Sequence, residues 1–308
     1  MEGLNQTITE TFLIVGFSDF PQLQVPLFVT FLLVYLITLV GNILIMTLIY
    51  TSPRLHTPMY FFLTNLSFID ISYISLIFPQ MLAHFFLEGA HVSLNECLLQ
   101  VYFFVLLVTA EFLLLTAMAY DRYVAICNPL RYQTIMNKAV CVRLAAGSWV
   151  TGFMTPITHT VLMSRFSYCE SHTINHFFCD FRNLIMLSCT STYTIDIAAY
   201  ILGSTFGLVP FALIIMSYVK ILSAILRIQS TQGRQKAFST CSSHLAVVIL
   251  FYISICSTYM QPASAHSVKG SKILSLLYTA ITPLCNPLIY SLKNTEIKNA
   301  LKKKTNTK

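Results

Sequence analysis

Seven long apolar stretches run through this chain of 308 residues, and they restrict the folds that it can adopt. A helix needs about 20 mostly apolar residues to cross the hydrocarbon core of a bilayer. Hydrophobic residues make up 56% of the chain and charged residues only 10%, whereas a soluble domain carries about a quarter charged residues. The sequence therefore predicts an all-α membrane protein, a seven-transmembrane helix bundle that forms one domain over residues 1–308. The expected spans are residues 25–50, 58–79, 97–120, 139–163, 194–226, 238–260 and 273–291.

The distribution of lysine and arginine predicts how the bundle is oriented. One set of connections holds fifteen of the 19 basic residues, and the opposite set holds the other four. Because basic residues gather on the cytosolic side, residues 1–24 are expected outside the cell and the tail, residues 292–308, in the cytosol. The sequon Asn5-Gln6-Thr7 then presents a glycosylation site, Asn5, on the outer side. Lys302–Lys304 in the tail fit contact with anionic membrane lipid better than contact with nucleic acid.

Two carboxyl groups fall inside the predicted spans, Asp70 in the second and Glu111 in the third. Charged groups are costly in a membrane and usually mark function there. We expect both to approach Asn286 of the seventh span. One interpretation is a small polar site that holds Na⁺, and the other is a pair of protonated carboxyls that join helices by hydrogen bonds. The same pair would suit an alternative function, a polytopic transporter or channel, although the halves of the chain show no internal repeat.

Five motifs follow one another in order along almost the whole chain. They are LHTPMYFFL at 55–63, MAYDRYVAICNPLRY at 118–132, Ser217-Tyr218, KAFSTCSSHL at 236–245 and PLCNPLIYSLKN at 283–294. With these motifs the chain resembles the olfactory (odorant) receptors, which are rhodopsin-like (class A) G-protein-coupled receptors. Phe251-Tyr252 stands in the sixth span where most rhodopsin-like receptors have a proline, and this also matches the olfactory group. The short outer loops resemble its tetrapod-type class (class II).

The resemblance implies an activation switch at the cytosolic face. At rest, Arg122 is expected to be held by its neighbour Asp121. Ligand binding would displace the cytosolic end of the sixth span and free Arg122 to meet Tyr218, Tyr290 and a G protein. The implied partner is a heterotrimeric stimulatory G protein of the olfactory type, which raises cyclic AMP, and the implied location is the plasma membrane of sensory cilia. The residues assigned to coupling are Asp121, Arg122, Tyr123, Tyr218, Lys236, His244, Asn286, Pro287 and Tyr290.

The ligand is expected between the outer halves of the third, fifth, sixth and seventh spans. The candidate residues are Phe104, Val105, Val108, Thr109, Leu202, Phe206, Tyr252, Ile255, Tyr259 and Thr279. This lining is apolar with a few hydroxyls, which suits a small, volatile, neutral organic molecule. Tyr259 is the preferred hydrogen-bond partner for a ligand oxygen. The outer half of the third span has no carboxylate, which argues against a site of the biogenic-amine type.

The stretch YCESHTINHFFCD at residues 168–180 carries cysteine and histidine at a spacing that suits a metal. Cys169, His172, His176 and Cys179 would supply the four ligands of a tetrahedral zinc site. The predicted topology, however, places this stretch outside the cell, where cysteines pair as disulfides and cease to be thiolate ligands. The zinc interpretation therefore loses two of its ligands.

Four cysteines lie on the predicted outer side, Cys97, Cys169, Cys179 and Cys189, and four cysteines allow three pairings. The residues alone do not choose among these pairings. The receptor resemblance implies a bond from Cys97 to Cys179 and another from Cys169 to Cys189, with a bond from Cys97 to Cys189 as the second choice.

A weaker metal hypothesis remains for this loop. His172 and His176, with Glu170 or Asp180, would hold a metal ion or respond to pH. The alternative, which we favour, is a disulfide-tethered loop that caps the ligand site and needs no metal or other cofactor.

Other functional classes lack their signatures. The chain contains no H-E-x-x-H, no G-x-S-x-G and no glycine loop for phosphate, so no enzyme is predicted. A retinal protein needs a lysine inside a span, whereas Lys272 and Lys293 flank the seventh span.

Overall fold

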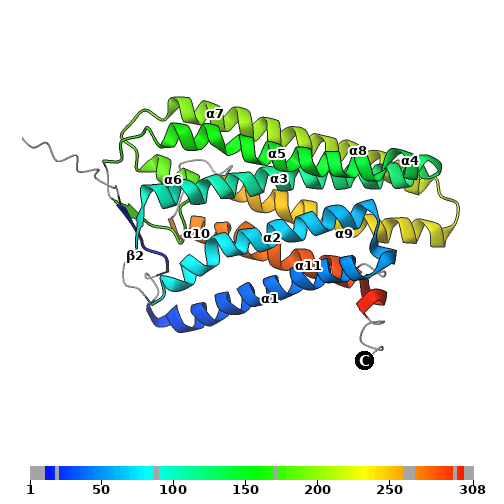
Figure 1. Cartoon of the computed structure of the whole chain (residues 1–308), viewed down its shortest axis with the longest axis horizontal. Helices are drawn as coiled ribbons and strands as arrows, with labels where there is room; N and C mark the ends of the chain where they lie inside the picture. The colour runs from blue at the N-terminus through cyan, green and yellow to red at the C-terminus, as the bar shows by residue number, and fades with distance from the viewer. Residues whose placement is uncertain are drawn as a thin grey trace, which may run out of the picture.

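The computed structural model describes residues 11–17, 21–86, 90–169, 172–259, 268–293 and 297–301. Its long helices lie alongside one another and run close to the long dimension of the molecule (Figure 1). Seven helices in this part of the chain are long and apolar enough to cross a membrane, which confirms the predicted seven-helix bundle. The first four are α1 (Gln24–Thr51), α2 (Pro58–Ala83), α3 (Leu94–Cys127) and α5 (Lys138–Met163). The fifth joins α7 (Tyr193–Gly203), the π-helical η4 (Ser204–Leu208) and α8 (Val209–Leu226); the sixth is α9 (Thr231–Tyr259); and the seventh joins α10 (Val268–Leu276), the π-helical η6 (Leu277–Ile281) and α11 (Thr282–Lys293).

Two helices extend well beyond the apolar ranges that predicted them. α3 continues to Cys127, past the expected end at residue 120, and α9 begins at Thr231, before the expected start at residue 238. Hydropathy responds to side chains, whereas backbone hydrogen bonds continue a helix into polar surroundings. The extensions therefore carry polar residues at one end of the bundle.

Side-chain burial identifies α3 as the central helix. In the most apolar 18-residue window of each helix, 67% of the residues of α3 are buried, compared with 28% of those of α1. α3 contacts α2, α5, α8 and α9. The outer faces of peripheral helices are also apolar, since Val40 of α1 is 65% exposed and Val219 of α8 is 57% exposed. Such faces suit lipid as the surrounding solvent.

Local sequence signals set several helix ends. Ser93 caps α3: its hydroxyl accepts from the Glu96 backbone N–H, and its own N–H donates to the Glu96 carboxylate at 2.8 Å. Asn137 caps α5 in a similar way, accepting from the Val140 N–H at 3.0 Å. Short helices link the spans at one end of the bundle, namely η2 (Pro53–Leu55), η3 (Pro129–Arg131) and α4 (Tyr132–Ile135), while η1 (Pro21–Leu23) precedes α1.

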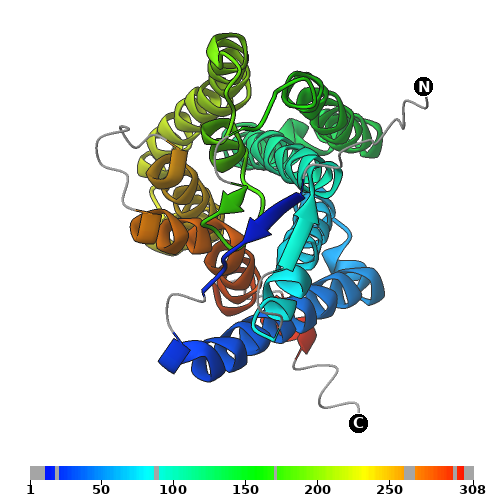
Figure 2. The same cartoon turned by 90° about the vertical axis from the view of Figure 1, so that its left-hand side faces the viewer.

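A small sheet crosses the other end of the bundle, and the sequence did not predict it. β1 (Thr11–Ile14) lies between β2 (Ala90–Ser93) and β3 (Thr173–Ile174), antiparallel to β2 and parallel to β3 (Figure 2). Strands of two to four residues are too short to show the alternation that marks a strand in sequence. We call this the disulfide end, because Cys97 and Cys179 lie there, and the opposite end the Arg122 end.

Candidate functional site

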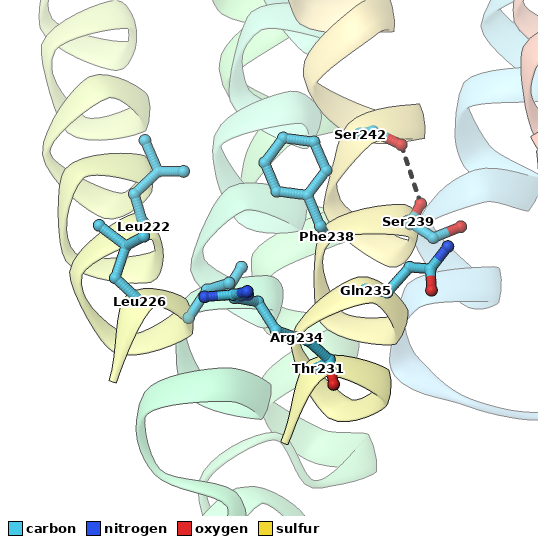
Figure 3. A pocket seen from close by; sticks show the side chains of 9 residues that line it. Leu222, Leu226, Thr231, Arg234, Gln235, Phe238, Ser239 and Ser242 are labelled. Carbon is cyan, nitrogen blue, oxygen red and sulfur yellow. Dashed lines mark hydrogen bonds between the residues drawn. The ribbon is translucent and has the colours of Figure 1, made fainter. Parts of the chain in front are cut away.

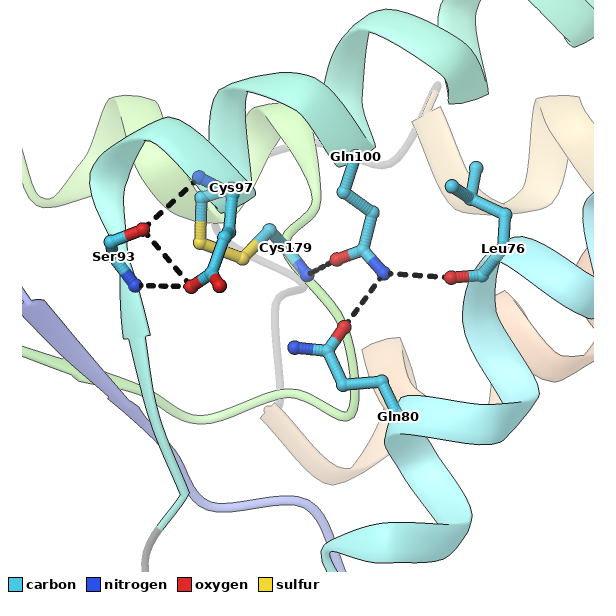
Figure 4. Close-up of a disulfide and its surroundings, with 7 residues drawn as sticks. Leu76, Gln80, Ser93, Cys97, Gln100 and Cys179 are labelled. Carbon is cyan, nitrogen blue, oxygen red and sulfur yellow. Dashed lines mark hydrogen bonds between the residues drawn. A yellow bond between two sulfur atoms is a disulfide. The ribbon is translucent and has the colours of Figure 1, made fainter.

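Two disulfides hold the loop between α5 and α7 at the disulfide end. Cys97 at the start of α3 is bonded to Cys179, with Cα atoms 5.2 Å apart, and Cys169 is bonded to Cys189, with Cα atoms 5.9 Å apart. These are the two pairings that the receptor resemblance implies. Gln100, one turn along α3, adds a polar clamp, because its side-chain oxygen accepts from the Cys179 backbone N–H at 2.8 Å (Figure 4).

The same glutamine ties the loop to the second helix. The side-chain nitrogen of Gln100 donates to the Gln80 side-chain oxygen at 2.9 Å and to the Leu76 carbonyl at 3.2 Å (Figure 4). Gln100 is buried, so each of these bonds replaces one that water would otherwise supply. The loop is therefore attached covalently to α3 and by hydrogen bonds, through Gln100, to α2.

Residues 176–180 of this loop turn inward and are all buried. Phe177 and Phe178 are both 0% exposed, and the Phe178 ring lies 5.8 Å from the ring of Phe104 on α3. A short α-helix, α6 (Phe181–Met186), follows directly. The loop thus closes the bundle from the disulfide end, and we refer to residues 172–180 as the lid.

Beneath the lid, a carboxylate and two tyrosines form a buried polar chain. The Tyr259 hydroxyl of α9 donates to Asp180 Oδ1 at 2.7 Å and lies 3.4 Å from the Tyr278 hydroxyl of η6. Burial raises the pKa of the Asp180 carboxyl, and the hydrogen bond from Tyr259 opposes that rise. Tyr278 in turn packs against Phe104 with ring centroids 5.5 Å apart. The third, sixth and seventh helices therefore meet the lid at one place.

The ten predicted ligand residues are buried or half-buried in the half of the bundle under the lid. Tyr259 belongs to the buried polar chain just described, and Phe104 packs against its other tyrosine, Tyr278. Tyr252 of α9 donates a hydrogen bond to the Gly207 carbonyl in η4 at 3.3 Å, next to Phe206, so the sixth and fifth helices also meet. The remaining members are Val105, Val108 and Thr109 of α3, Leu202 of α7, Ile255 of α9 and Thr279 of η6.

Three residues of this region were not among the predicted ligand residues. They are Asp180, which the sequence suggests only as a metal ligand, Tyr278, which precedes the predicted Thr279, and Phe112, whose ring centroid lies 5.1 Å from that of Tyr252. Tyr278 directly precedes Thr279, and Phe112 lies one turn beyond Val108 on α3, so helix spacing points to both. No local sequence signal places Asp180 beside Tyr259. Asp180 brings a carboxylate from the lid to a region where α3 supplies none.

The metal hypothesis for the loop finds no supporting geometry. In the described part of the chain, no group of three or more His, Cys, Asp or Glu side chains can hold a metal ion, and Glu170 lies outside that part. His172 is exposed, whereas His176 is buried with its Nε2 3.2 Å from the Ser275 hydroxyl. Burial, with Lys272 nearby, lowers the pKa of His176 to about 3. This imidazole is therefore neutral at physiological pH.

At the Arg122 end, Arg122 is held by its neighbour. The Arg122 guanidinium donates twice to Asp121, with the bond from Nε 2.9 Å long, and the Tyr132 hydroxyl donates to the other Asp121 oxygen at 2.7 Å. Asp121 is 0% exposed, so it depends on these donors for compensation of its buried charge. The next residue, Tyr123, packs under Lys220, whose ammonium lies 5.5 Å from its ring centroid.

The predicted partners of Arg122 make other contacts. The Tyr218 hydroxyl of α8 lies 2.7 Å from His244 Nδ1 of α9, and their rings are stacked. Tyr290 is 1% exposed, and its hydroxyl has no hydrogen-bond partner within the described residues. The side chain of Lys236 lies outside the described part of the chain. Arg122 is thus paired with Asp121, and among the described residues no hydrogen bond joins it to either tyrosine.

A groove of about 870 Å³ opens between α8 and α9 at this end (Figure 3). Its walls are apolar, with polar residues along α9. The lining residues are Leu222, Ile225, Leu226, Thr231, Arg234, Gln235, Phe238, Ser239 and Ser242. The two helices that the Tyr218–His244 contact joins therefore separate beyond it.

Among the intramembrane residues, the structure brings Asp70 and Asn286 together. The Asn286 side-chain nitrogen donates to both Asp70 oxygens, at 3.0 and 3.2 Å. Glu111 is also buried, and within the described residues its Oε1 has no partner, nor has the side-chain oxygen of Asn286. Nearby, a Cβ on Gly41 would lie 3.3 Å from Pro287, so glycine allows α1 to approach α11 closely.

Seven membrane-length helices, a disulfide-tethered lid packed on a cluster of aromatic side chains and a paired arginine at the far end define a seven-helix membrane receptor. Comparison with known proteins agrees. A family model described as "Olfactory receptor" matches residues 31–308. Olfactory receptor 1G1 of Gorilla gorilla gorilla is 47% identical over 98% of this chain and 97% of its own length. Olfactory receptor 8H1 of Homo sapiens is 48% identical over 96% of this chain and 95% of its own.

The chain belongs to the olfactory receptor family. Its function is that of an odorant receptor rather than an enzyme, and the family together with the seven apolar helices indicates a multi-pass protein of the plasma membrane. Family membership also favours a receptor over the transporter or channel alternative.

Proposed function

We propose that this receptor binds small, mostly apolar, neutral organic molecules under the lid and activates a stimulatory, olfactory-type G protein that raises cyclic AMP. The contact of Tyr259 with Asp180 carries the proposal. It joins the sixth helix, which would move on activation, to the lid. A ligand that changes this contact acts on both at once. We call the proposed ligand site under the lid the chamber.

The chemistry of the chamber supports a ligand of this kind. Phe104, Phe178 and Tyr252 supply aromatic surface, and the polar groups are few and convergent. The Tyr259 hydroxyl donates to Asp180 of the lid, and a ligand oxygen would accept from it in competition with Asp180. An oxygen-bearing odorant thereby gains a hydrogen bond that a hydrocarbon does not.

At the Arg122 end, the proposed resting state is the pairing of Arg122 with Asp121. Activation would move the start of α9 outward, break the Tyr218–His244 contact and release Arg122 toward Tyr218, Tyr290 and the G protein. Arg227 and Arg234 are exposed at this end and would attract an acidic partner or anionic lipid. This scheme places the Arg122 end in the cytosol and the lid outside the cell, with sensory cilia as the proposed location.

We also propose, as a secondary feature, that a sodium ion binds between the second, third and seventh helices. Two buried oxygens without partners in the described part of the chain, on Glu111 and Asn286, are ligands of the type that hard cations take. Asp70 would add charge to such a site. These residues would bind and orient the ion, which would bias the resting arrangement of the helices.

A cyclic-AMP reporter assay with a panel of odorants tests the function. We expect a concentration-dependent response from the full chain and its loss in Arg122→Ala at equal surface expression. Unchanged signalling by Arg122→Ala would contradict the coupling scheme. Absence of any odorant response in surface-expressed receptor, with uptake of a solute in its place, would favour the transporter alternative.

A further inference from the structure

Residues 11–17, which we call the strap, lie across the disulfide end, and the first four of them form β1, the central strand of the sheet (Figure 2). The strap's N–H groups donate to the lid's carbonyls: Leu13 to His172 at 2.7 Å, Val15 to Ile174 at 3.0 Å and Gly16 to His176 at 3.0 Å. Phe12 and Ile14 point inward and are 0% and 2% exposed. The strap is therefore hydrogen-bonded to the lid and buries two of its side chains.

The strap turns at Gly16, whose φ of +59° is the one left-handed backbone conformation among the described residues. This turn brings Phe17 back over the bundle. The Phe17 ring stacks on Phe177 of the lid, with centroids 5.5 Å apart, and packs against Phe31 of α1 at 5.2 Å. The strap thus touches the lid on one side and the first helix on the other.

One face of α10 holds both the strap and the lid. The Lys272 ammonium donates to the Gly16 carbonyl at 2.7 Å, and Ser275, one turn further, lies against His176 at 3.2 Å. Positions three apart share a helix face. Because Gly16 is also bonded to His176, the contacts close a ring of Lys272, Gly16, His176 and Ser275.

The burial of Lys272 gives this ring its strength. Its side chain is 2% exposed, and burying an ammonium is costly unless hydrogen bonds compensate. A hydrogen bond from a charged donor is about twice as strong as a neutral one. The Gly16 carbonyl accepts such a bond, so movement of the strap would leave a buried charge with one acceptor fewer.

The ring acts on the ligand chamber through the lid. Directly after His176, the lid places Phe178 against Phe104 and Asp180 against Tyr259. We propose that Lys272 is a positioning residue that, through the strap, holds the lid closed over the chamber and so sets how fast ligand exchanges. The effect on ligand rests on the proposed function, whereas the effect on the lid does not.

Amide hydrogen exchange of the purified full-length receptor, without ligand, tests the lid directly. Lys272→Met keeps the length of the side chain and removes the donor, Lys272→Arg keeps a charged donor, and Lys298→Met removes an exposed lysine at the opposite end. We expect exchange in residues 11–17 and 172–178 to rise about tenfold or more in Lys272→Met, to return close to wild type in Lys272→Arg and to stay unchanged in Lys298→Met. Wild-type exchange in Lys272→Met, or equal acceleration in Lys272→Arg, would overturn the proposal.

A second variant covers the case in which Lys272→Met yields no folded receptor. Ser275→Ala keeps Lys272 and removes the hydroxyl, on the same face of α10, that His176 contacts. This variant should accelerate amide hydrogen exchange in residues 172–178 more than in residues 11–17. Unchanged exchange in both segments would contradict the proposed role of this ring of contacts.

The effect on ligand exchange is tested with an agonist that the odorant panel identifies. After washout, cyclic-AMP production should decay about threefold or more faster in Lys272→Met than in wild type, with recovery in Lys272→Arg. Faster exchange of the lid with unchanged decay would overturn the ligand part of the proposal alone. A wild-type receptor that responds to no odorant would refute the proposed function, and hydrogen exchange would still decide whether Lys272 holds the lid.

Discussion

The Tyr218 hydroxyl lies 2.7 Å from His244 Nδ1, and this contact joins α8 to α9 just above the point where the two helices separate into a groove. Both residues are buried, so the bond is shielded from water and its loss has a definite cost. Because Arg122 is meanwhile paired with Asp121, the contact belongs to the proposed resting state.

We expect His244→Phe to raise basal cyclic-AMP production. The substitution keeps a planar ring and removes the ring nitrogen that Tyr218 contacts, and a loss of about 1 kcal/mol from the resting state shifts a two-state equilibrium about fivefold. Basal reporter activity at matched surface expression is the measurement. Tyr218→Phe removes the same bond but also the proposed partner of freed Arg122, so it should not raise basal activity; an equal rise in both variants would contradict the switch.

Tyr259→Phe should weaken responses to oxygen-bearing odorants about tenfold while leaving apolar analogues of similar shape within about twofold, since one hydrogen bond is lost. Concentration–response curves for matched alcohol and hydrocarbon pairs provide the measurement. Asp180→Asn, which keeps an acceptor for Tyr259, serves as the matched control and should change selectivity less. Equal losses for both ligand types would indicate a packing role for Tyr259.

The lid should open more easily as the pH falls. The pKa of His176 is about 3 in the folded lid, below its ordinary value near 6.5, so the opened lid binds more protons and acid favours opening. Between pH 7 and 5.5, the free energy of opening should fall by about 1 kcal/mol. Hydrogen exchange in residues 172–180, corrected for the intrinsic rate, measures this change. His176→Gln should abolish it, and a slope that survives in His176→Gln would assign it to another group.

Sodium dependence separates the two interpretations of the buried carboxyls. If Na⁺ binds between Asp70, Glu111 and Asn286, replacing NaCl with choline chloride should raise basal activity severalfold in the wild-type receptor, and Glu111→Gln should lose this response. If the carboxyls are protonated and only join helices, the exchange of cations should leave the wild-type receptor unchanged.

Glycosylation at Asn5 tests the proposed orientation. Asn5 lies outside the described residues. In the receptor expressed in mammalian cells, Asn5→Gln should increase electrophoretic mobility to that of enzymatically deglycosylated protein, because the sequon would face the secretory lumen. Identical mobility of wild type and variant, with or without deglycosylation, would indicate that the N-terminal segment is cytosolic or unmodified. That result would contradict the proposed orientation.

Much of the architecture and part of the candidate site followed from sequence. Each span is selected by the composition of one window of about 20 residues, so the seven helices could be located without knowing their neighbours. Asp121 and Arg122 are adjacent, and their pairing is local. Asp70 and Asn286 were placed together because a polar group in a membrane needs a polar partner, and spans offer few.

The sequence alone determined the seven helices and the polar groups within them, because the bilayer imposes its conditions on each span separately. Tertiary structure decided the disulfide end. Asp180 meets Tyr259 across 79 positions, and Gly16 meets Lys272 across 256. The strands of the small sheet carry no periodic signal of their own and form only where the lid and the bundle offer hydrogen-bond partners and apolar cover. Such contacts depend on how separate segments converge in space, which no single window of sequence contains.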